Sequence, residues 1–388
     1  MTTFIHTADW HLGRPFHSIR EDESRFRLRQ ARLDAVSRIG EVARAKGARF
    51  CVVAGDLFDC PTPPQETVAA ALGAIGGLGV QVHVIPGNHD HGGPAGPWRT
   101  DHFIREQPRL APNLVVHQEG VPCVVEGIVL LPAPLAARHE LQDPTLWIRD
   151  ASFGELPPDL PRVVLAHGST MEFMGASDPD DFLAGTPNLI HLARLPLGEV
   201  DYVALGDWHG TQQVGDKAWY SGTPEPDRFP RGTDYASGQV LVVEVERGGS
   251  PQVEAAPTGS TFWRTKSLHV PGDERLADAL QELEALAGTR TGRDLLRLTV
   301  TGRVGLASRS ELDQRLADLE ARFLQLDVDM KKLHLQPSED ELASLSERPG
   351  DPVVAQVAAS FLAQLGGEQD RIAGLALQRL HAYVTEED

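Results

Sequence analysis

Five apolar segments of this chain end in short clusters of aspartate, histidine and asparagine. The clusters are Asp9 and His11 in HTADWHLG, Asp56 and Asp59 in VVAGDLFD, Asn88, His89 and Asp90 in VIPGNHDH, His167 in VLAHGS, and Asp207 and His209 in VALGDWHG. One Gly-Asp pair after a strand is common turn chemistry. The carboxyl ends of strands in an open α/β sheet, however, form the crevice where ligands bind. Five such ends in one chain therefore predict a functional site.

The residue types in these clusters suit divalent metal ions. Aspartate and asparagine offer hard oxygen ligands, histidine offers nitrogen, and no thiolate takes part. This mixture favours a six-coordinate ion such as Mn²⁺ and leaves Mg²⁺, Fe²⁺ and Zn²⁺ open. Two ions about 3.5–4 Å apart can clamp a phosphoryl group, so phosphoester chemistry is the expectation.

Residues 1–260 have the pattern of a layered α/β domain that would position these clusters. Several expected strands are continuous apolar runs, typical of strands buried on both faces. The expected strands are 3–7, 49–54, 80–85, 127–131, 162–166, 201–205 and 238–246. Helices are expected at 24–46 and 65–77.

The pattern changes after residue 260, and we expect two further parts. A smaller α+β domain at 261–348 would contain helices 274–287 and 308–323 and strands 295–302 and 326–330. Ser310 to Asp313 resembles a capping box at the start of the second helix. A C-terminal helical segment, 349–388, would follow.

Composition limits the class of protein. The chain has 388 residues, of which 41% are hydrophobic and 23% charged, and no apolar run is long enough for a membrane helix. Three irregularly spaced cysteines and the lack of a secretory signal favour a reducing cytoplasm. A net charge of −19 is awkward for a nucleic-acid binder, so local features such as bound metal would have to attract an anion.

The series D-x-H, G-D-x-x-D, G-N-H-D, H-G and G-x-x-H resembles the calcineurin-like metallophosphoesterase family. HTADWHLG, VVAGDLFDCPTPP and VIPGNHD are most similar to its DNA-repair nuclease subunits of the SbcD and YhaO type, and SGTPEPDRF is similar to a later loop of those proteins. The resemblance implies a sheet sandwich flanked by helices, a capping domain and C-terminal helices.

The resemblance also implies roles for the clusters. A first metal would be held by Asp9, His11 and His209, with Asp56 bridging to a second metal held by Asn88, His167 and Asp207. His89 would not be a ligand but would lie near the scissile phosphodiester, stabilising charge or protonating the leaving oxygen. Asp59 and Asp90 would orient His89 and neighbouring ligands.

Asp207 departs from the pattern of the family, which has Gly-His-x-His at this point. With Asp9, Asp56 and Asp207 ionised, the ligands carry −3 against +4 from two metals, and a histidine would leave −2. The second metal would then be a weaker Lewis acid and harder in preference, or be held through water. Alternatively, Asp207 points away and the second site is impaired.

Three functions are consistent with these features. The first is a two-metal DNA nuclease, exonuclease or endonuclease, acting in DNA repair with an SbcC-like coiled-coil ATPase, with a homodimer open. The second is a phosphodiesterase or phosphatase for a small phosphorylated molecule, which suits the acidic charge better. The third is a non-catalytic scaffold with a modified metal site. Arg14, Arg228 and Arg231 lie near the motifs, but solubility explains them equally well, and no DNA-contacting residue is assigned.

Overall fold

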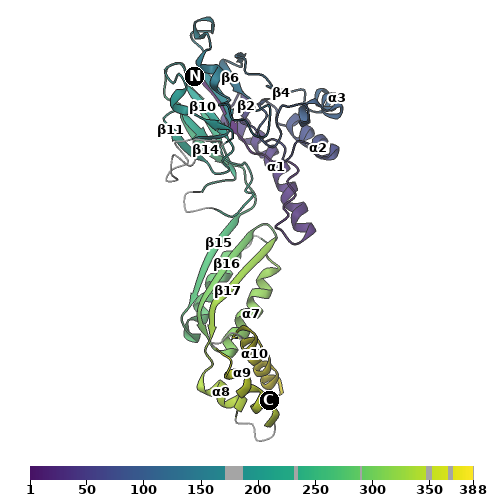
Figure 1. The fold of residues 1–388 in the computed structure, drawn as a ribbon, viewed down its shortest axis with the longest axis vertical. Coiled ribbons are helices and arrows are strands. Elements are labelled where there is room, and N and C mark those ends of the chain that lie inside the picture. The colour runs from purple at the N-terminus through teal and green to yellow at the C-terminus, as the bar shows by residue number, and fades with distance from the viewer. Residues whose placement is uncertain (171–186, 231–234, 289–290, 347–351, 366–369, 388) are drawn as a thin grey trace. The chain divides into compact units, whose positions relative to one another are not determined.

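The structure is a computed structural model of the whole chain (Figure 1), and it describes residues 1–170, 187–230, 235–288, 291–346, 352–365 and 370–387. Contacts within the chain form two compact units, Met1–Thr261 and Phe262–Asp388. The further division expected at residue 349 falls within 347–351, outside the described residues, and stays a prediction.

The first unit contains two six-stranded sheets. In the first sheet, four parallel strands continue into two antiparallel ones. In sheet order its strands are β14 (Gln252–Pro257), β13 (Gln239–Val245), β1 (Thr2–Thr7), β2 (Phe50–Val53), β3 (Gln81–Val84) and β4 (Leu114–Val116). Helices α1 (Asp22–Lys46), α2 (Gln65–Gly76) and α3 (Asp101–Leu110) connect the parallel strands.

The second sheet has a parallel centre and an antiparallel strand at each edge. In order its strands are β11 (Gln212–Gly215), β12 (Ala218–Tyr220), β10 (Tyr202–Gly206), β7 (Arg162–His167), β6 (Ile128–Ala133) and β5 (Cys123–Val125). A short helix, α4 (Leu146–Arg149), a two-stranded ladder, β8 (Ser169–Thr170) with β9 (Leu189–Ile190), and three short 3-10 helices complete the described elements of the unit.

Alternation along the strands builds an apolar layer on each side of the first sheet. Phe4 of β1 and Phe50 of β2 stack at 5.1 Å and pack with Tyr202 of the second sheet. Ile5 and Cys51, the next residues, pack in a second cluster with α1 and α2. Both faces of these strands are therefore buried, which accounts for their continuous apolar runs. The layered α/β sandwich expected from the sequence is confirmed.

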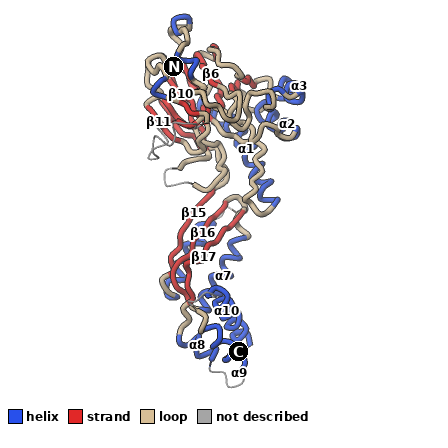
Figure 2. The backbone as a smooth tube through the Cα atoms, in the orientation of Figure 1, coloured by secondary structure: helices blue, strands red, loops and turns tan. Residues whose placement is uncertain are grey.

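The second unit has a three-stranded parallel sheet with its own core. Its strands are β15 (Trp263–Val270), β16 (Leu295–Val304) and β17 (Gln325–Leu335). Helices α6 (Leu276–Ala287) and α7 (Leu306–Glu320) connect the strands, and α8 (Glu339–Ser346), α9 (Pro352–Leu362) and α10 (Asp370–Glu387) follow. Figure 2 shows this change from strands to helices along the unit.

Two details of the second unit correct the sequence-based expectations. Strand β15 was not expected, because only Trp263, Leu268 and Val270 of its eight residues are apolar, and polar residues separate them. The expected capping box was wrong: α7 begins at Leu306, and the Ser310 hydroxyl donates back to the Leu306 carbonyl within the helix. Among the described residues, no helix is both long and apolar enough to cross a membrane.

Two glycines in α2 give a matched test of the packing of this helix. A Cβ on Gly76 would lie 2.0 Å from the Leu110 carbonyl oxygen, whereas a Cβ on Gly73 would meet nothing within 4 Å. We expect Gly76→Ala to lower the free energy of unfolding by about 1–3 kcal/mol. Gly73→Ala should raise it by about 0.5–1 kcal/mol, because alanine costs less entropy in a helix. Urea unfolding of both variants checks this, and equal effects would contradict the packing of α2 described here.

Candidate metal centre

The sandwich brings all five polar clusters to the carboxyl ends of neighbouring strands. In the first sheet, β1, β2 and β3 are adjacent, and they lead into the clusters at Asp9, Asp56 and Asn88. In the second sheet, β7 ends at His167 and pairs with β10, which leads into Asp207. Oxygen or nitrogen atoms lie within 4.8 Å of one another in three groups: Asp9, His11 and His209; His11, Asp56 and His89; and Asp9, Asp56 and His167.

Four residues of the clusters have a backbone conformation that is uncommon for residues other than glycine. The φ angles of Asp9, His11, Asp56 and Asp207 are 55°, 42°, 54° and 100°, in the left-handed region. Such residues cost about 1–3 kcal/mol each and persist only where the surroundings hold them. Here the contacts that hold them come from neighbouring strand ends. The His11 amide donates to the Asp56 carbonyl at 2.9 Å, and the Asp207 amide donates to the Asp9 carboxylate at 3.2 Å.

Three imidazoles turn Nε2 toward the cluster because an acceptor faces each Nδ1. His209 Nδ1 donates to Asp227 Oδ2 at 2.8 Å, and His167 Nδ1 donates to the Ala54 carbonyl at 2.7 Å. His11 Nδ1 lies 3.2 Å from Asp59 Oδ1 but without hydrogen-bond geometry. In His209 and His167 a proton on Nδ1 leaves a lone pair on Nε2, and Nε2 is then the atom that can bind a metal.

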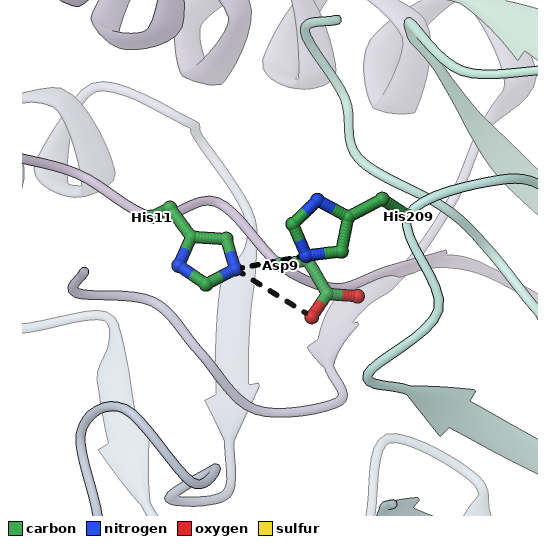
Figure 3. A group of neighbouring side chains, drawn as sticks. All are labelled: Asp9, His11 and His209. Atoms are coloured by element: carbon green, nitrogen blue, oxygen red, sulfur yellow. Dashed lines mark hydrogen bonds and ion pairs between the residues drawn. The ribbon is translucent and has the colours of Figure 1, made fainter. Parts of the chain in front are cut away.

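The Nε2 atoms of His11 and His209 approach to 3.2 Å beside the Asp9 carboxylate (Figure 3). Two lone pairs at this distance repel unless a cation or proton lies between them. Burial, and then the neighbouring His209, lowers the pKa of His11 well below its usual value. Burial also lowers the pKa of His209, even though Asp227 acts in the opposite direction. Both rings are therefore neutral, as ligands must be.

For the carboxyl groups, burial disfavours the ionised form, which is the form that a metal ligand requires. Burial raises the pKa of Asp9 well above its usual value, and the nearby Asp56 and Asp207 carboxylates add to that effect. Burial likewise raises the pKa of Asp56, with Asp90 adding to the rise. A divalent cation would reverse this penalty, because opposite charge at short range favours the ionised form.

The Asp56 carboxylate lies between the two halves of the cluster, a first half with Asp9, His11 and His209 and a second half around His167. Its Oδ2 is 3.5 Å from His11 Nε2, and its Oδ1 is 3.6 Å from His167 Nε2. His167 Nε2 and Asn88 Oδ1 are buried and make no hydrogen bond within the part of the chain that the structure describes. A buried polar atom without a partner is costly, so its position here points to a ligand. The residues thus fit a pair of divalent ions that share Asp56.

Asp207 lies at the edge of this cluster. Its Oδ1 is 3.9 Å from His167 Nε2, and its Oδ2 accepts a hydrogen bond from the Ser169 hydroxyl at 2.8 Å. About a quarter of its side chain, 27%, is exposed. The carboxylate therefore neighbours the second half of the cluster, and its role as a ligand stays a prediction.

His89 and the two flanking acids occupy different places. The half-buried His89 donates from Nδ1 to the Asp59 carbonyl at 2.6 Å, and its ring meets His11 edge-on at 4.8 Å. Asp90 is fully buried, and its carboxylate accepts from the amides of Gly87 and Phe58 at 2.7 and 3.1 Å. Asp90 therefore holds backbone, whereas Asp59 faces His11 with its carboxylate and His89 with its carbonyl.

Sequence reasoning missed two buried residues that support the cluster. Arg32 of α1 donates to the carbonyls of Asp9 at 2.9 Å and Trp10 at 2.7 Å, and these two bonds hold the turn after β1 in place. Asp227 receives the His209 hydrogen bond, and although burial opposes its ionisation, His209 and nearby arginines keep its pKa well below the usual value. Asp227 lies in SGTPEPDRF, a segment singled out as motif-like, whereas no local signal marks an arginine that faces inward from a helix.

Comparisons with known proteins agree with this arrangement. The chain is 28% identical over 257 residues to the SbcD subunit of the nuclease SbcCD of Escherichia coli (strain K12), a match that covers 58% of this chain and 61% of that protein. It is 36% identical over 101 residues to "Uncharacterized metallophosphoesterase YhaO" of Bacillus subtilis (strain 168), covering 25% and 24% of the two chains. The match to the first relative thus spans less than two thirds of its length.

A solved structure described as the crystal structure of TT1561 of Thermus thermophilus aligns with 66% of this chain and 99% of its own. Its TM-score of 0.41 and 14% identity are too low to support a functional assignment. The family match is decisive, because residues 2–211 fit the family described as calcineurin-like phosphoesterase and contain all five clusters. By its sequence and by the candidate metal-binding groups at the ends of its strands, the chain belongs to the calcineurin-like phosphoesterase family.

Proposed function

We propose that this protein is a DNA nuclease that hydrolyses phosphodiester bonds with two divalent ions, preferably Mn²⁺. The observation that carries the proposal is the convergence of three imidazole Nε2 atoms on buried carboxylates, beside which the buried Asn88 oxygen has no hydrogen-bond partner among the described residues. The oxygen and nitrogen donors suit Mn²⁺. The likeness to a nuclease component supports DNA as the substrate.

Each ion would have its own set of side chains. Asp9, His11, Asp56 and His209 would hold the first ion, and Asp56, Asn88, His167 and Asp207 the second. Ions bound there supply Lewis acidity to the phosphoryl group and lower the pKa of a water nucleophile. The protein contributes geometry, because the strained turns and the acceptors at each Nδ1 prevent the ligands from rotating away.

His89 is proposed to act on the leaving group. Because a carbonyl only accepts hydrogen bonds, the 2.6 Å contact with Asp59 places a proton on Nδ1 and leaves Nε2 as the working atom. When His89 is protonated, Nε2–H can stabilise negative charge on the phosphate and donate a proton to the departing oxygen. Asp59, which also faces His11, would set the position of both rings.

The proposal is tested with labelled duplex DNA, a panel of cyclic nucleotides and phosphate monoesters, each incubated with Mn²⁺. We expect the parent to cleave DNA. His167→Ala should lose at least about a hundredfold in rate, because metal stabilisation is worth several kcal/mol. His102→Ala serves as the control, since that ring on α3 contacts Gln65 and Arg105. Duplexes labelled at the 3′ or the 5′ end report the polarity of digestion.

The outcomes separate the alternatives. Cleavage of small phosphoesters with no cleavage of DNA would replace the nuclease by a small-molecule phosphoesterase, which the net charge of −19 favours. DNA binding with no hydrolysis of any substrate in excess Mn²⁺ would instead indicate a scaffold.

Asp207 gives a second test, through its backbone as well as its carboxylate. Asp207→Gly removes the proposed ligand and also relieves the φ of 100°. Relief of strain and loss of the Ser169 hydrogen bond oppose each other. Stability in EDTA should therefore change by no more than about 1 kcal/mol. Metal content, measured by mass spectrometry after dialysis against Mn²⁺, should fall from two ions to one.

Two further variants at this position complete the test. Asp207→Asn keeps an oxygen donor without charge and should weaken only the second ion, and Asp207→His restores the pattern of the family and should keep both. Two ions bound to the Asp207→Gly variant with parental affinity would show that Asp207 is not a ligand.

We further propose that the C-terminal helices bind a coiled-coil ATPase of the SbcC kind. Ile372 and Leu375 lie one turn apart on α10 and expose 64% and 50% of their surface. The name of the SbcCD relative supports a multi-subunit assembly for that protein. A homodimer is the alternative occupant of the same face.

Binding to the candidate ATPase can be measured with the full chain. Ile372→Asp with Leu375→Asp should weaken it at least about tenfold, since apolar anchors at interfaces cost about 2 kcal/mol or more when lost. Val121→Asp, at a residue of the first unit that is 56% exposed, is the matched control. Equal binding by all three proteins would exclude this face, and concentration-dependent light scattering would reveal a homodimer.

A further inference from the structure

Two partly exposed arginines adjoin the metal-binding cluster of this acidic protein. Arg14 follows the first cluster and Arg228 follows the SGTPEPDRF aspartate, and their side chains are 25% and 31% exposed. With a net charge of −19, an anionic substrate is repelled by most of the surface. Positive charge beside the cluster would therefore attract an anionic substrate to the site.

One buried carboxylate holds both guanidinium groups. Arg228 Nε lies 3.2 Å from Asp227 Oδ1, and Arg14 Nη1 lies 3.4 Å from Asp227 Oδ2. Arg14 Nη1 is also 3.4 Å from Asp59 Oδ1. Asp59 also faces His11, and Asp227 also binds His209, so each guanidinium contacts a carboxylate that lies at the Nδ1 side of an imidazole of the first metal group.

Arg228 reaches furthest toward the cluster. Its Nη2 lies 2.8 Å from His209 Nδ1 and 3.3 Å from His209 Nε2, the atom turned toward the metal group. A phosphate bound against that group would thus meet a guanidinium at its edge. A planar guanidinium offers paired N–H donors that match two phosphate oxygens.

Neutralisation of Asp227 alone does not explain two such arginines. The carboxylate already accepts a hydrogen bond from His209, and the fully buried Arg32 also attracts it. The contacts of Arg14 with its two acids are long, at 3.4 Å each, and a quarter of the side chain is exposed. Donors on both arginines are therefore left over for a ligand, because each guanidinium has five N–H groups.

We propose that Arg14 and Arg228 form a phosphate-binding pair that holds the non-bridging oxygens of a substrate phosphate against the metal group. This inference rests on the proposed phosphodiester hydrolysis and extends it by naming the residues that bind the anion. The pair supplies, within the site, the positive charge that the protein as a whole lacks. Asp227 is its positioning residue, because the same carboxylate sets the spacing of both guanidiniums.

The test measures phosphate binding separately from catalysis. Inorganic phosphate is titrated calorimetrically into the Mn²⁺-loaded parent and its Arg14→Gln, Arg228→Gln and Arg228→Lys variants. We expect each glutamine variant to bind at least about tenfold more weakly, since hydrogen bonds to charged groups are worth about 1.5–3 kcal/mol. The phosphate affinity of the lysine variant should lie between those of the parent and the glutamine variant, because lysine keeps the positive charge but lacks the paired N–H donors of a guanidinium.

Metal content and a remote arginine provide the controls. Mn²⁺ stoichiometry should stay equal to that of the parent in every variant. Arg49→Gln should leave phosphate affinity unchanged, because Arg49 precedes β2 at the end opposite to the candidate ligands and pairs with Glu126. Phosphate affinity within twofold of the parent in both glutamine variants would overturn the proposal.

Kinetics then identify the source of the phosphate. With bis(4-nitrophenyl) phosphate and with duplex DNA, KM should rise about tenfold for each lost arginine. A rise for both substrates places the pair at the scissile phosphate, and a rise for DNA alone places it on a neighbouring backbone phosphate.

Failure of this inference differs from failure of the proposed function. A parent that hydrolyses no phosphodiester, but whose phosphate affinity depends on the arginines, would contradict only the proposed function. Normal hydrolysis with unchanged phosphate affinity and KM in the variants would contradict only this inference.

Discussion

Crowding of buried carboxylates around neutral imidazoles is the interaction on which the rest of the site depends. Asp9 and Asp56 are both buried, and burial raises the pKa of each; the Asp56 and Asp207 carboxylates add to the rise at Asp9, and Asp90 adds to the rise at Asp56. Burial lowers the pKa of His11 and His209 beside them, and the Nε2 atoms of these two rings lie only 3.2 Å apart. Neutral imidazoles do not supply the positive charge that would favour ionised carboxylates, whereas a divalent cation would bind both the carboxylates and the imidazoles. Metal binding and the stability of this region are therefore coupled.

The surrounding structure holds the cluster together at a cost in backbone strain. Asp9, His11, Asp56 and Asp207 each have positive φ. The compensation is tertiary: Arg32 binds two carbonyls of the first turn, Asp90 binds two amides, and Asp227 fixes His209. Glycine is required where strands approach most closely, since a Cβ on Gly206 would lie 1.9 Å from the Ala54 carbonyl oxygen. Strain of this kind concentrates at functional sites, where it keeps ligands in one geometry.

The aspartate at 207 changes the balance between the two halves of the cluster. A carboxylate is shorter than an imidazole, and here one of its oxygens is engaged by Ser169. The other oxygen lies 3.9 Å from His167 Nε2, so the extra negative charge falls on the half of the cluster around His167. A hard ion with flexible coordination suits that half better than one that prefers nitrogen.

The sequence by itself determined the layered α/β class, most strands of the sandwich and the residues of all five clusters, because hydrophobic runs and the polar residues after them are local patterns. Strand β15 and the true start of α7 escaped it, since short alternating runs and a serine within a helix give ambiguous local signals. Only the tertiary structure decided which way each imidazole faces, that Asp90 binds backbone, and that Arg32 and Asp227 support the cluster. Those facts depend on contacts between residues far apart in the chain, such as the 2.7 Å bond from His167 to Ala54, and no local pattern encodes a partner more than a hundred residues away.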